Sequence, residues 1–274
     1  MKGRIMRYEK TVSFCLVLLT TLLLSVSQSF AIGNLSPLPV EYFSVEGHDA
    51  FVIEAEHPAD GKPWVWYAPT LKVLPSSNWH GWYFKQLLEA GISIGGIDLG
   101  EVRGSPASNE KFTLFYDEMV RRGFSRKPIL LGQSRGGLMM LSWAMRNPDK
   151  LTAFAGIYPV CNLASWPLKS NKVFVLKDYG LSEEQLRSDI GLYNPIDNLQ
   201  GLLQHNVPVF IIHGNADKVV PYEENSAILK ERYEAGGGNV GVKIIDGQGH
   251  QISPEFFECR ELLDFMIEQA KKGE

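Results

Sequence analysis

Short apolar runs alternate with amphipathic stretches over most of this chain, and this order constrains its fold more than any other feature. Apolar runs that suit strands lie at 92–99, 128–131, 151–157, 207–212 and 240–245. Stretches with helical spacing of apolar residues lie at 82–90, 112–122, 138–145, 223–234 and 255–270. Strands joined by helices of this length form parallel sheets that are covered on both faces. We therefore expect an α/β fold around a mostly parallel sheet, with helices on both faces.

Two segments depart from this alternation. Strand-like runs at 41–45, 51–56 and 64–67 are separated by turn residues, which predicts an antiparallel meander at the N-terminal part of the sheet. Residues 160–205 are irregular and contain several prolines, so we expect an insertion that lies like a lid over the edge of the sheet where the parallel strands end. With no internal repeat, we interpret residues 32–274 as one domain.

The first 31 residues have the layout of a secretory signal peptide. Basic residues at the start are followed by an apolar stretch from Val12 to about Val26, and then by small residues at Ser29 and Ala31. An uncleaved membrane anchor is the alternative, but this stretch is shorter than the ~20 residues that span a bilayer. We expect cleavage after about Ala31, a secreted or periplasmic protein, and no stable membrane insertion afterwards.

Composition narrows the classes of partner and cofactor. The 274 residues are 45% hydrophobic with a net charge of −4, which supplies a large core and argues against nucleic acid as a partner. The mature chain retains Cys161 and Cys259, and no Cys/His spacing suits zinc. The two cysteines either pair after export or remain as separate buried thiols. The sequence does not indicate an oligomeric state.

The sequence GQSRG at 132–136 follows one apolar strand and precedes a helix. A sharp turn between them pushes the side chain of Ser134 out at the carboxyl edge of the sheet, and it requires small neighbours such as Gly132 and Gly136. In a chain with 26 glycines the pentapeptide also arises by chance, with Ser134 as a packing residue. Its place between strand and helix favours the interpretation that Ser134 is a nucleophile.

A serine nucleophile needs a base that takes its proton and an acid that orients the base. The strand at 207–212 runs into Asp217, and the strand at 240–245 runs into His250. Each residue alone fits an ordinary loop position, and Asp246 is a competing acid, although it lies only four residues before His250. Together, at strand ends that share one edge, Ser134, Asp217 and His250 predict a catalytic triad.

Beyond these motifs, the mature chain resembles an α/β-hydrolase over essentially its full length, and it is most similar to secreted, prolyl-oligopeptidase-like serine esterases. The resemblance is carried by four stretches: KPWVW at 62–66, GQSRGG at 132–137, NPIDN at 194–198 and HGNAD at 213–217. It implies hydrolysis of carboxylic esters through an acyl-enzyme, without a metal or organic cofactor. The alternatives are a serine peptidase, although we expect no room for the propeller domain of such relatives, and a non-catalytic binding protein on this fold.

The oxyanion hole is where the chain departs from its relatives. Many related esterases place His-Gly-Gly directly after the third strand, but this chain reads Tyr67-Ala68-Pro69 there, and His80-Gly81 comes more than ten residues later. One donor should be the backbone N–H of Arg135, directly after the nucleophile. For the second we predict the backbone near Tyr67 or at Ala68, because Pro69 has no N–H.

Residues that we expect to contact substrate lie on loops around the same edge: Tyr67, Trp82, Arg103 and Trp166. Aromatic side chains there suit sugar faces or aromatic acyl groups, and the alternative is that they hold the loops down as hydrophobic plugs. Arg103 and Arg135 either meet a substrate carboxylate or form structural salt bridges. We expect a small-molecule or carbohydrate ester as the substrate.

Overall fold

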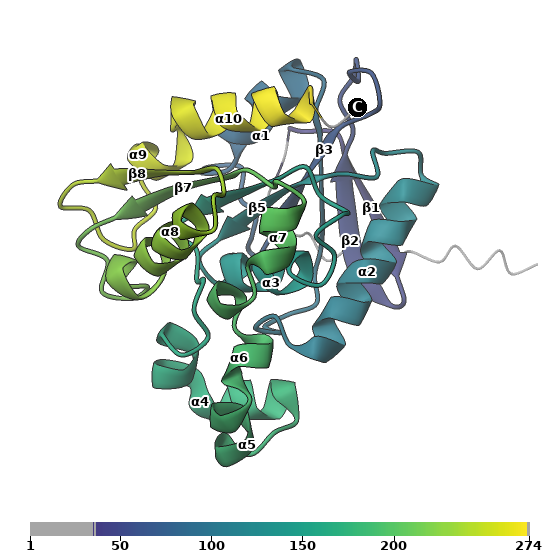
Figure 1. Cartoon of the computed structure of the whole chain (residues 1–274). Helices are drawn as coiled ribbons and strands as arrows, with labels where there is room; N and C mark the ends of the chain where they lie inside the picture. Colours follow the sequence, from purple (N-terminus) through teal and green to yellow (C-terminus); the bar gives the residue numbers. More distant parts are fainter. Residues whose placement is uncertain (1–34, 36, 273–274) are drawn as a thin grey trace, which may run out of the picture.

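Eight strands form one sheet in the order β1-β2-β4-β3-β5-β6-β7-β8 in the computed structural model, which describes residue 35 and residues 37–272 (Figure 1). The predicted signal peptide lies outside the described residues. The strands are β1 (Val40–Val45), β2 (His48–Ile53), β3 (Trp64–Ala68), β4 (Ser93–Ile97), β5 (Ile129–Gln133), β6 (Ala153–Ile157), β7 (Val209–Gly214) and β8 (Val240–Ile245). Only the pairs β1–β2 and β2–β4 are antiparallel. This confirms a mostly parallel sheet with an antiparallel N-terminal part.

The expected meander is wrong for its third strand. β3 does not pair with β2 but lies parallel between β4 and β5, in the middle of the sheet. All five of its residues are buried, as expected for a strand that is covered on both faces. Its position matters for the site, because the end of β3 lies beside the end of β5, where Ser134 follows.

Helices cover both faces of the sheet and enclose two separate cores (Figure 1). α1 (Gly81–Glu89) and α10 (Arg260–Ala270) pack on one face, and α2 (Pro106–Arg121), α3 (Arg135–Ala144) and α8 (Ser226–Ala235) on the other. Cys161 belongs to the core under α2 and α3, and Cys259 to the core under α1 and α10. Both thiols are buried and unpaired, because they lie on opposite faces of the sheet.

Helix boundaries differ from the predicted ones where glycine or proline is involved. α2 begins at Pro106 rather than at residue 112, because proline is well tolerated in the first turn of a helix. α3 begins at Arg135 rather than at residue 138, since Gly136 and Gly137 are themselves helical. The C-terminal helix is interrupted at Glu258, which separates α9 (Pro254–Phe257) from α10.

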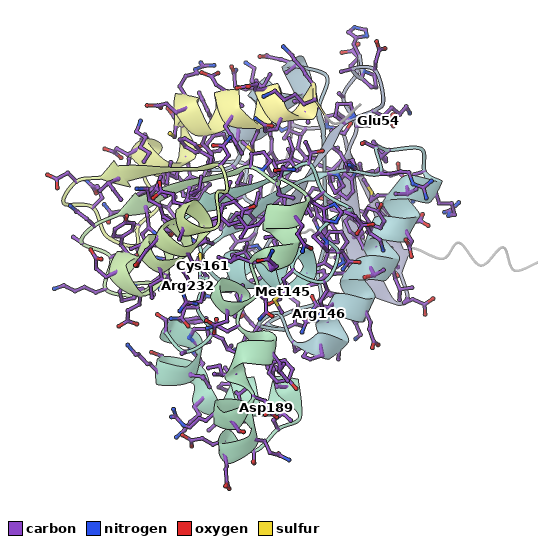
Figure 2. All side chains as sticks on the ribbon, viewed as in Figure 1. Glu54, Met145, Arg146, Cys161, Asp189 and Arg232 are labelled. Carbon is purple, nitrogen blue, oxygen red and sulfur yellow. The ribbon has the colours of Figure 1, made fainter. Side chains whose placement is uncertain are left out.

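Residues 160–205 contain short helices where the sequence predicts irregular structure: α4 (Trp166–Tyr179), α5 (Glu183–Ser188), α6 (Ile190–Tyr193), the 3-10 helix η1 (Pro195–Asp197) and α7 (Gln200–Gln204). α4 to α6 project from the sheet, with Asp189 near the far end of the projection (Figures 1 and 2). α4 has no clean apolar stripe, because Val173 and Phe174 are exposed and Asn171 breaks its geometry. Among the described residues, no helix has the length and apolar character needed to cross a membrane.

Candidate active site

Ser134 occupies the sharp turn between β5 and α3. Its φ of 50° and ψ of −120° lie outside the common regions for residues with a side chain, a conformation that costs on the order of 1–3 kcal/mol. The turn is held by its backbone, because the N–H of Ser134 donates to Ile157 O at 2.9 Å and its carbonyl accepts from Val160 N at 2.8 Å. A Cβ on Gly136 would collide with the carbonyl of Ala68. The glycine predicted from the motif is therefore required where α3 passes the end of β3.

The structure brings Ser134, His250 and Asp217 into one row. Ser134 Oγ lies 2.8 Å from His250 Nε2, and His250 Nδ1 lies 2.7 Å from Asp217 Oδ2. Asp246, the competing acid, instead accepts a hydrogen bond from Asn215 Nδ2 at 2.8 Å. The geometry is that of a nucleophile, a base and an orienting acid.

The carboxylate of Asp217 is buried and fully hydrogen-bonded. Its Oδ1 accepts from the backbone N–H groups of Val219 and Val220, both at 2.8 Å, and its Oδ2 faces His250. Burial acts to raise the pKa of Asp217, but the nearby His213 together with the bonds from His250 and the Val220 backbone outweighs it and holds that pKa well below its ordinary value. The group is therefore a carboxylate wherever the enzyme is folded near neutral pH.

His213, which the sequence places near the site without a defined role, supports the turn that carries Asp217. It is completely buried, and its Nε2 lies 2.8 Å from Val220 O and 3.6 Å from Asp217 Oδ2. Its Nδ1 lies 2.8 Å from Ser226 Oγ. Because a carbonyl can only accept, Nε2 carries the hydrogen and ties the turn after Asp217 to the end of β7.

Gln133, directly before the nucleophile, is the centre of a buried polar network. Its Oε1 accepts from Tyr67 Oη at 2.7 Å and from His80 Nε2 at 2.9 Å, and its Nε2 donates to Tyr158 Oη at 3.3 Å. His80 Nδ1 accepts from the N–H of Ser76 at 3.0 Å, so Nε2 carries the hydrogen. Burial lowers the pKa of His80 to about 4, which keeps the ring neutral. The sequence places His80 on a loop at the edge of the sheet, where it could line the site, whereas Tyr158 does not stand out in the sequence.

Comparison with known families identifies the group to which this fold and site belong. A model of the prolyl oligopeptidase family matches residues 111–273, which is more than half of the chain and includes Ser134, Asp217 and His250. The chain belongs to the prolyl oligopeptidase family. A search of curated protein sequences finds no significant match.

Solved structures show the same fold for this prolyl oligopeptidase family protein. A puromycin-hydrolyzing peptidase of Mycobacterium tuberculosis is 16% identical with a TM-score of 0.64, over 84% of this chain but only 40% of the peptidase. Est1E from Butyrivibrio proteoclasticus is 18% identical with a TM-score of 0.60, over 85% of this chain and 99% of Est1E. A truncated carbohydrate esterase from gut microbiota is 16% identical with a TM-score of 0.63, over 84% and 93%. At these identities the matches establish the α/β-hydrolase fold.

The predicted oxyanion donors lie beside the nucleophile of this prolyl oligopeptidase family protein. Arg135 is the first residue of α3, and the N–H groups of a first helical turn have no acceptor within the helix. Its backbone N–H is therefore available to donate to a developing oxyanion, and this role stays a prediction. Ala68 ends β3, and the group that it turns against Gly136 is its carbonyl, which is an acceptor. A donor role for the Ala68 N–H stays a prediction.

Among the residues expected to contact substrate, Tyr67 needs correction. Its side chain is completely buried and its hydroxyl is used by Gln133, so it has no surface to offer a substrate. Trp82 is partly buried in α1, with its ring 5.3 Å from the guanidinium of Arg260 at the start of α10. These contacts agree with the alternative that such aromatic residues hold structural elements together.

Arg103 and Arg135, which the sequence offers as partners for a substrate carboxylate, both form ion pairs within the protein. Arg103 donates to Asp178 Oδ2 in α4 at 2.5 Å, which fastens the insertion to the loop after β4. Arg135 pairs with Glu101, and its guanidinium lies 5.7 Å from the ring of Trp166. Trp166 thus lies beside the residue that follows the nucleophile, and the insertion reaches the predicted edge of the sheet through it.

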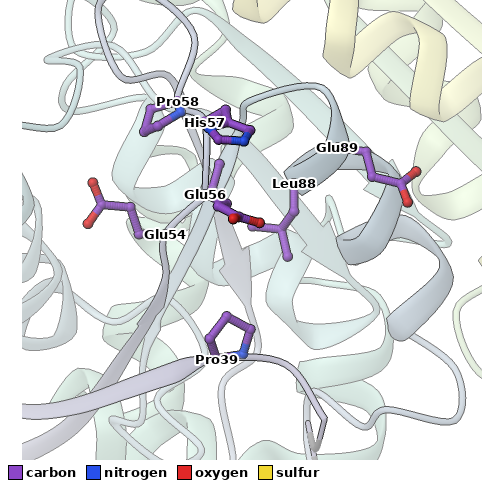
Figure 3. Close-up of a pocket in the computed structure, with 8 residues that line it drawn as sticks. Pro39, Glu54, Glu56, His57, Pro58, Leu88 and Glu89 are labelled. Atoms are coloured by element: carbon purple, nitrogen blue, oxygen red, sulfur yellow. The ribbon is translucent and has the colours of Figure 1, made fainter.

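A cavity of about 860 Å³ lies elsewhere, between the segment after β2 and the end of α1 (Figure 3). Residues 39, 54–58 and 88–89 line it, with three carboxylates among them, and no member of the triad takes part. This cavity is therefore separate from the candidate active site. The described part of the chain gathers no group of three metal-ligating His, Cys, Asp or Glu side chains.

Proposed function

We propose that this protein is a secreted serine hydrolase that cleaves carboxylic esters through an acyl-enzyme. One observation carries the proposal: Ser134, strained on its turn, is hydrogen-bonded to His250, and His250 is hydrogen-bonded to a buried carboxylate. This row supplies the nucleophile, the base and the orienting acid of an acyl transfer, and the first turn of α3 offers a backbone donor for the oxyanion. Export is part of the proposal, because residues 1–31 have the layout of a secretory signal peptide.

In the first half of the reaction, Ser134 Oγ attacks the ester carbonyl while His250 Nε2 takes its proton. The oxyanion accepts a hydrogen bond from the Arg135 N–H, and Asp217 stabilises the imidazolium. The tetrahedral intermediate then collapses, and the alcohol leaves with the proton from His250. In the second half, His250 removes a proton from water, the hydroxide attacks the acyl-enzyme, and the acid is released as the proton returns to Ser134.

The solved structures that share this fold include Est1E and a carbohydrate esterase, and these support an ester as the first candidate substrate. They also include the puromycin-hydrolyzing peptidase. The partly buried Trp166, which lies beside Arg135, suits a carbohydrate or small acyl ester. A serine peptidase is the second candidate, because the family is named for an oligopeptidase.

A substrate panel tests the proposal. Purified protein, with Ser134→Ala as the matched control, is assayed on p-nitrophenyl acetate, acetylated oligosaccharides, and prolyl and alanyl peptide amides. We expect turnover of the esters that disappears in the Ser134→Ala variant. Peptide amides cleaved faster than esters would favour the peptidase, and ester turnover that survives in the variant would refute the role of Ser134.

A further inference from the structure

His250 is hydrogen-bonded at both nitrogens, from Nδ1 to Asp217 Oδ2 and from Nε2 to Ser134 Oγ, but the bond to Ser134 changes when the serine is acylated. At that stage only the bond from Nδ1 to Asp217 holds the imidazole, and the ring can rock about it. His250 comes from the loop between β8 and α9, which is neither helix nor strand. Proton transfer needs Nε2 to stay aimed at Ser134 Oγ, so a second contact must set the tilt.

Tyr158 makes this contact. Its ring centroid lies 4.3 Å from that of His250 at an interplanar angle of 51°. Phe256 backs the tyrosine ring at 5.0 Å, and the side chain is 2% exposed. The Tyr158 N–H donates to Ile212 O at 2.8 Å, which ties its backbone to β7. The Tyr158 ring against which His250 packs is therefore itself held in place.

The backbone of Tyr158 is strained in a way that needs a reason. Its φ is 35°, in the left-handed region that a bulky residue avoids, at a cost on the order of 1–3 kcal/mol. This conformation is found directly after β6, at the edge of the sheet where Ser134 and Asp217 also lie. Such strain persists only where the surrounding structure enforces it, and it gathers at functional sites.

Tyr158 is also connected to the nucleophile. Gln133 Nε2 donates to Tyr158 Oη, and Gln133 is itself held by Tyr67 and His80. The network that fixes the residue before Ser134 thus reaches the ring that backs His250. The positions of nucleophile and base are coupled through Gln133 and Tyr158, independently of the direct bond between Ser134 and His250.

We propose that Tyr158 is a positioning residue whose ring packs against the His250 ring and keeps Nε2 aimed at Ser134 during both proton transfers. This inference rests on the proposed serine hydrolase function. The ring carries the effect, and the hydroxyl contributes through the anchor to Gln133.

Three variants separate these contributions. Tyr158→Phe keeps the ring and should retain most of kcat on p-nitrophenyl acetate. Tyr158→Leu and Tyr158→Met fill much of the space without a flat face, and they should lower kcat about 10- to 100-fold with little change in KM. Tyr233→Leu is the matched control, because Tyr233 is equally buried, with its hydroxyl 2.6 Å from Val207 O in the core beside α8. We expect it to lower stability but to leave kcat per folded molecule unchanged.

The outcomes distinguish this inference from the proposed function. If Tyr158→Met keeps the wild-type kcat, or if Tyr158→Phe loses as much as Tyr158→Met, the positioning role is refuted even though Ser134→Ala is inactive. If Ser134→Ala is as active as wild type, the proposed function itself fails. Thermal unfolding of every variant provides the folded fraction. Should Tyr158→Leu and Tyr158→Met both fail to fold, the Tyr158→Phe result alone decides whether the ring suffices.

Discussion

Replacing Asp217 by asparagine should remove almost all activity while leaving the fold intact. The side chains have the same shape, and the asparagine oxygen can still accept from the N–H groups of Val219 and Val220. The amide nitrogen would then face His250 Nδ1, which lies 2.7 Å from the carboxylate in the wild type. Because that nitrogen can only donate, it forces the hydrogen of the ring onto Nε2, where it blocks proton transfer from Ser134.

The expected loss of kcat in Asp217→Asn combines the effect of the wrong histidine tautomer with the effect of the lost negative charge. The wrong tautomer and the loss of charge behind the imidazolium together cost about 10⁴ in kcat for an aspartate in this position, a value that comes from the triad of a serine protease rather than from this chain. At 1.36 kcal/mol per factor of ten, this corresponds to about 5.4 kcal/mol of lost transition-state stabilisation. The substrate still binds, so KM should change little.

The assay is steady-state hydrolysis of p-nitrophenyl acetate at pH 7.5, with Asp246→Asn as the matched control. Asp246 lies on the same loop as His250, but it is bonded to Asn215 rather than to the histidine. We expect Asp246→Asn to retain kcat close to wild type. The reasoning is refuted if Asp217→Asn keeps more than a tenth of wild-type kcat, or if the two variants lose activity equally.

Three further predictions concern His80, Gly136 and Glu101. As the pH falls from 6.5 to about 4, His80 binds a proton in the unfolded chain but not in the folded protein, where it is buried, so the free energy of unfolding falls, by about 2 kcal/mol at pH 5 from this group. Urea unfolding at pH 7.5 and pH 5 should show a smaller fall in the His80→Gln variant. An equal fall in wild type and variant would contradict the assignment. Gly136→Ala should lower both kcat and the melting temperature, because the added Cβ would meet the Ala68 carbonyl. Gly81→Ala, with open space around it, should change neither. If the two variants behave alike in enzyme assays and thermal unfolding, the close approach of Gly136 to Ala68 is unimportant. Glu101→Gln removes the carboxylate paired with Arg135, so the guanidinium can pair with the carboxylate of a succinyl monoester instead. The kcat/KM of this ester relative to that of a butyryl ester should rise about fivefold. An unchanged ratio would show that Arg135 does not face the acyl group.

The candidate triad could be predicted from the sequence because each member follows a strand. Parallel strands bring their carboxyl ends to one edge, so Ser134, Asp217 and His250 had to meet once β5, β7 and β8 were recognised. The glycines around Ser134 carried the rest of this information, since only a close approach of helix and strand requires them at those positions.

Other features depend on long-range packing, which no local pattern encodes. β3 pairs with β4 and β5 rather than with β2, and the local pattern at 64–67 does not show which strands will be its neighbours. Tyr67 and Tyr158 each carry a hydroxyl that looks available in the sequence, yet both are buried around Gln133. The helices of the insertion escaped prediction because α4 is broken at Asn171 and leaves apolar side chains exposed.

The most direct test of the central claim is covalent labelling with a fluorophosphonate probe, followed by mass spectrometry of the digested protein. A fluorophosphonate reacts only with a serine whose proton a neighbouring base removes, so it reports on the nucleophile whatever the substrate. We predict one adduct, on the peptide that contains Ser134, and its loss in Ser134→Ala and His250→Ala. An unlabelled wild-type protein, or a label on another residue that persists in Ser134→Ala, would contradict the account.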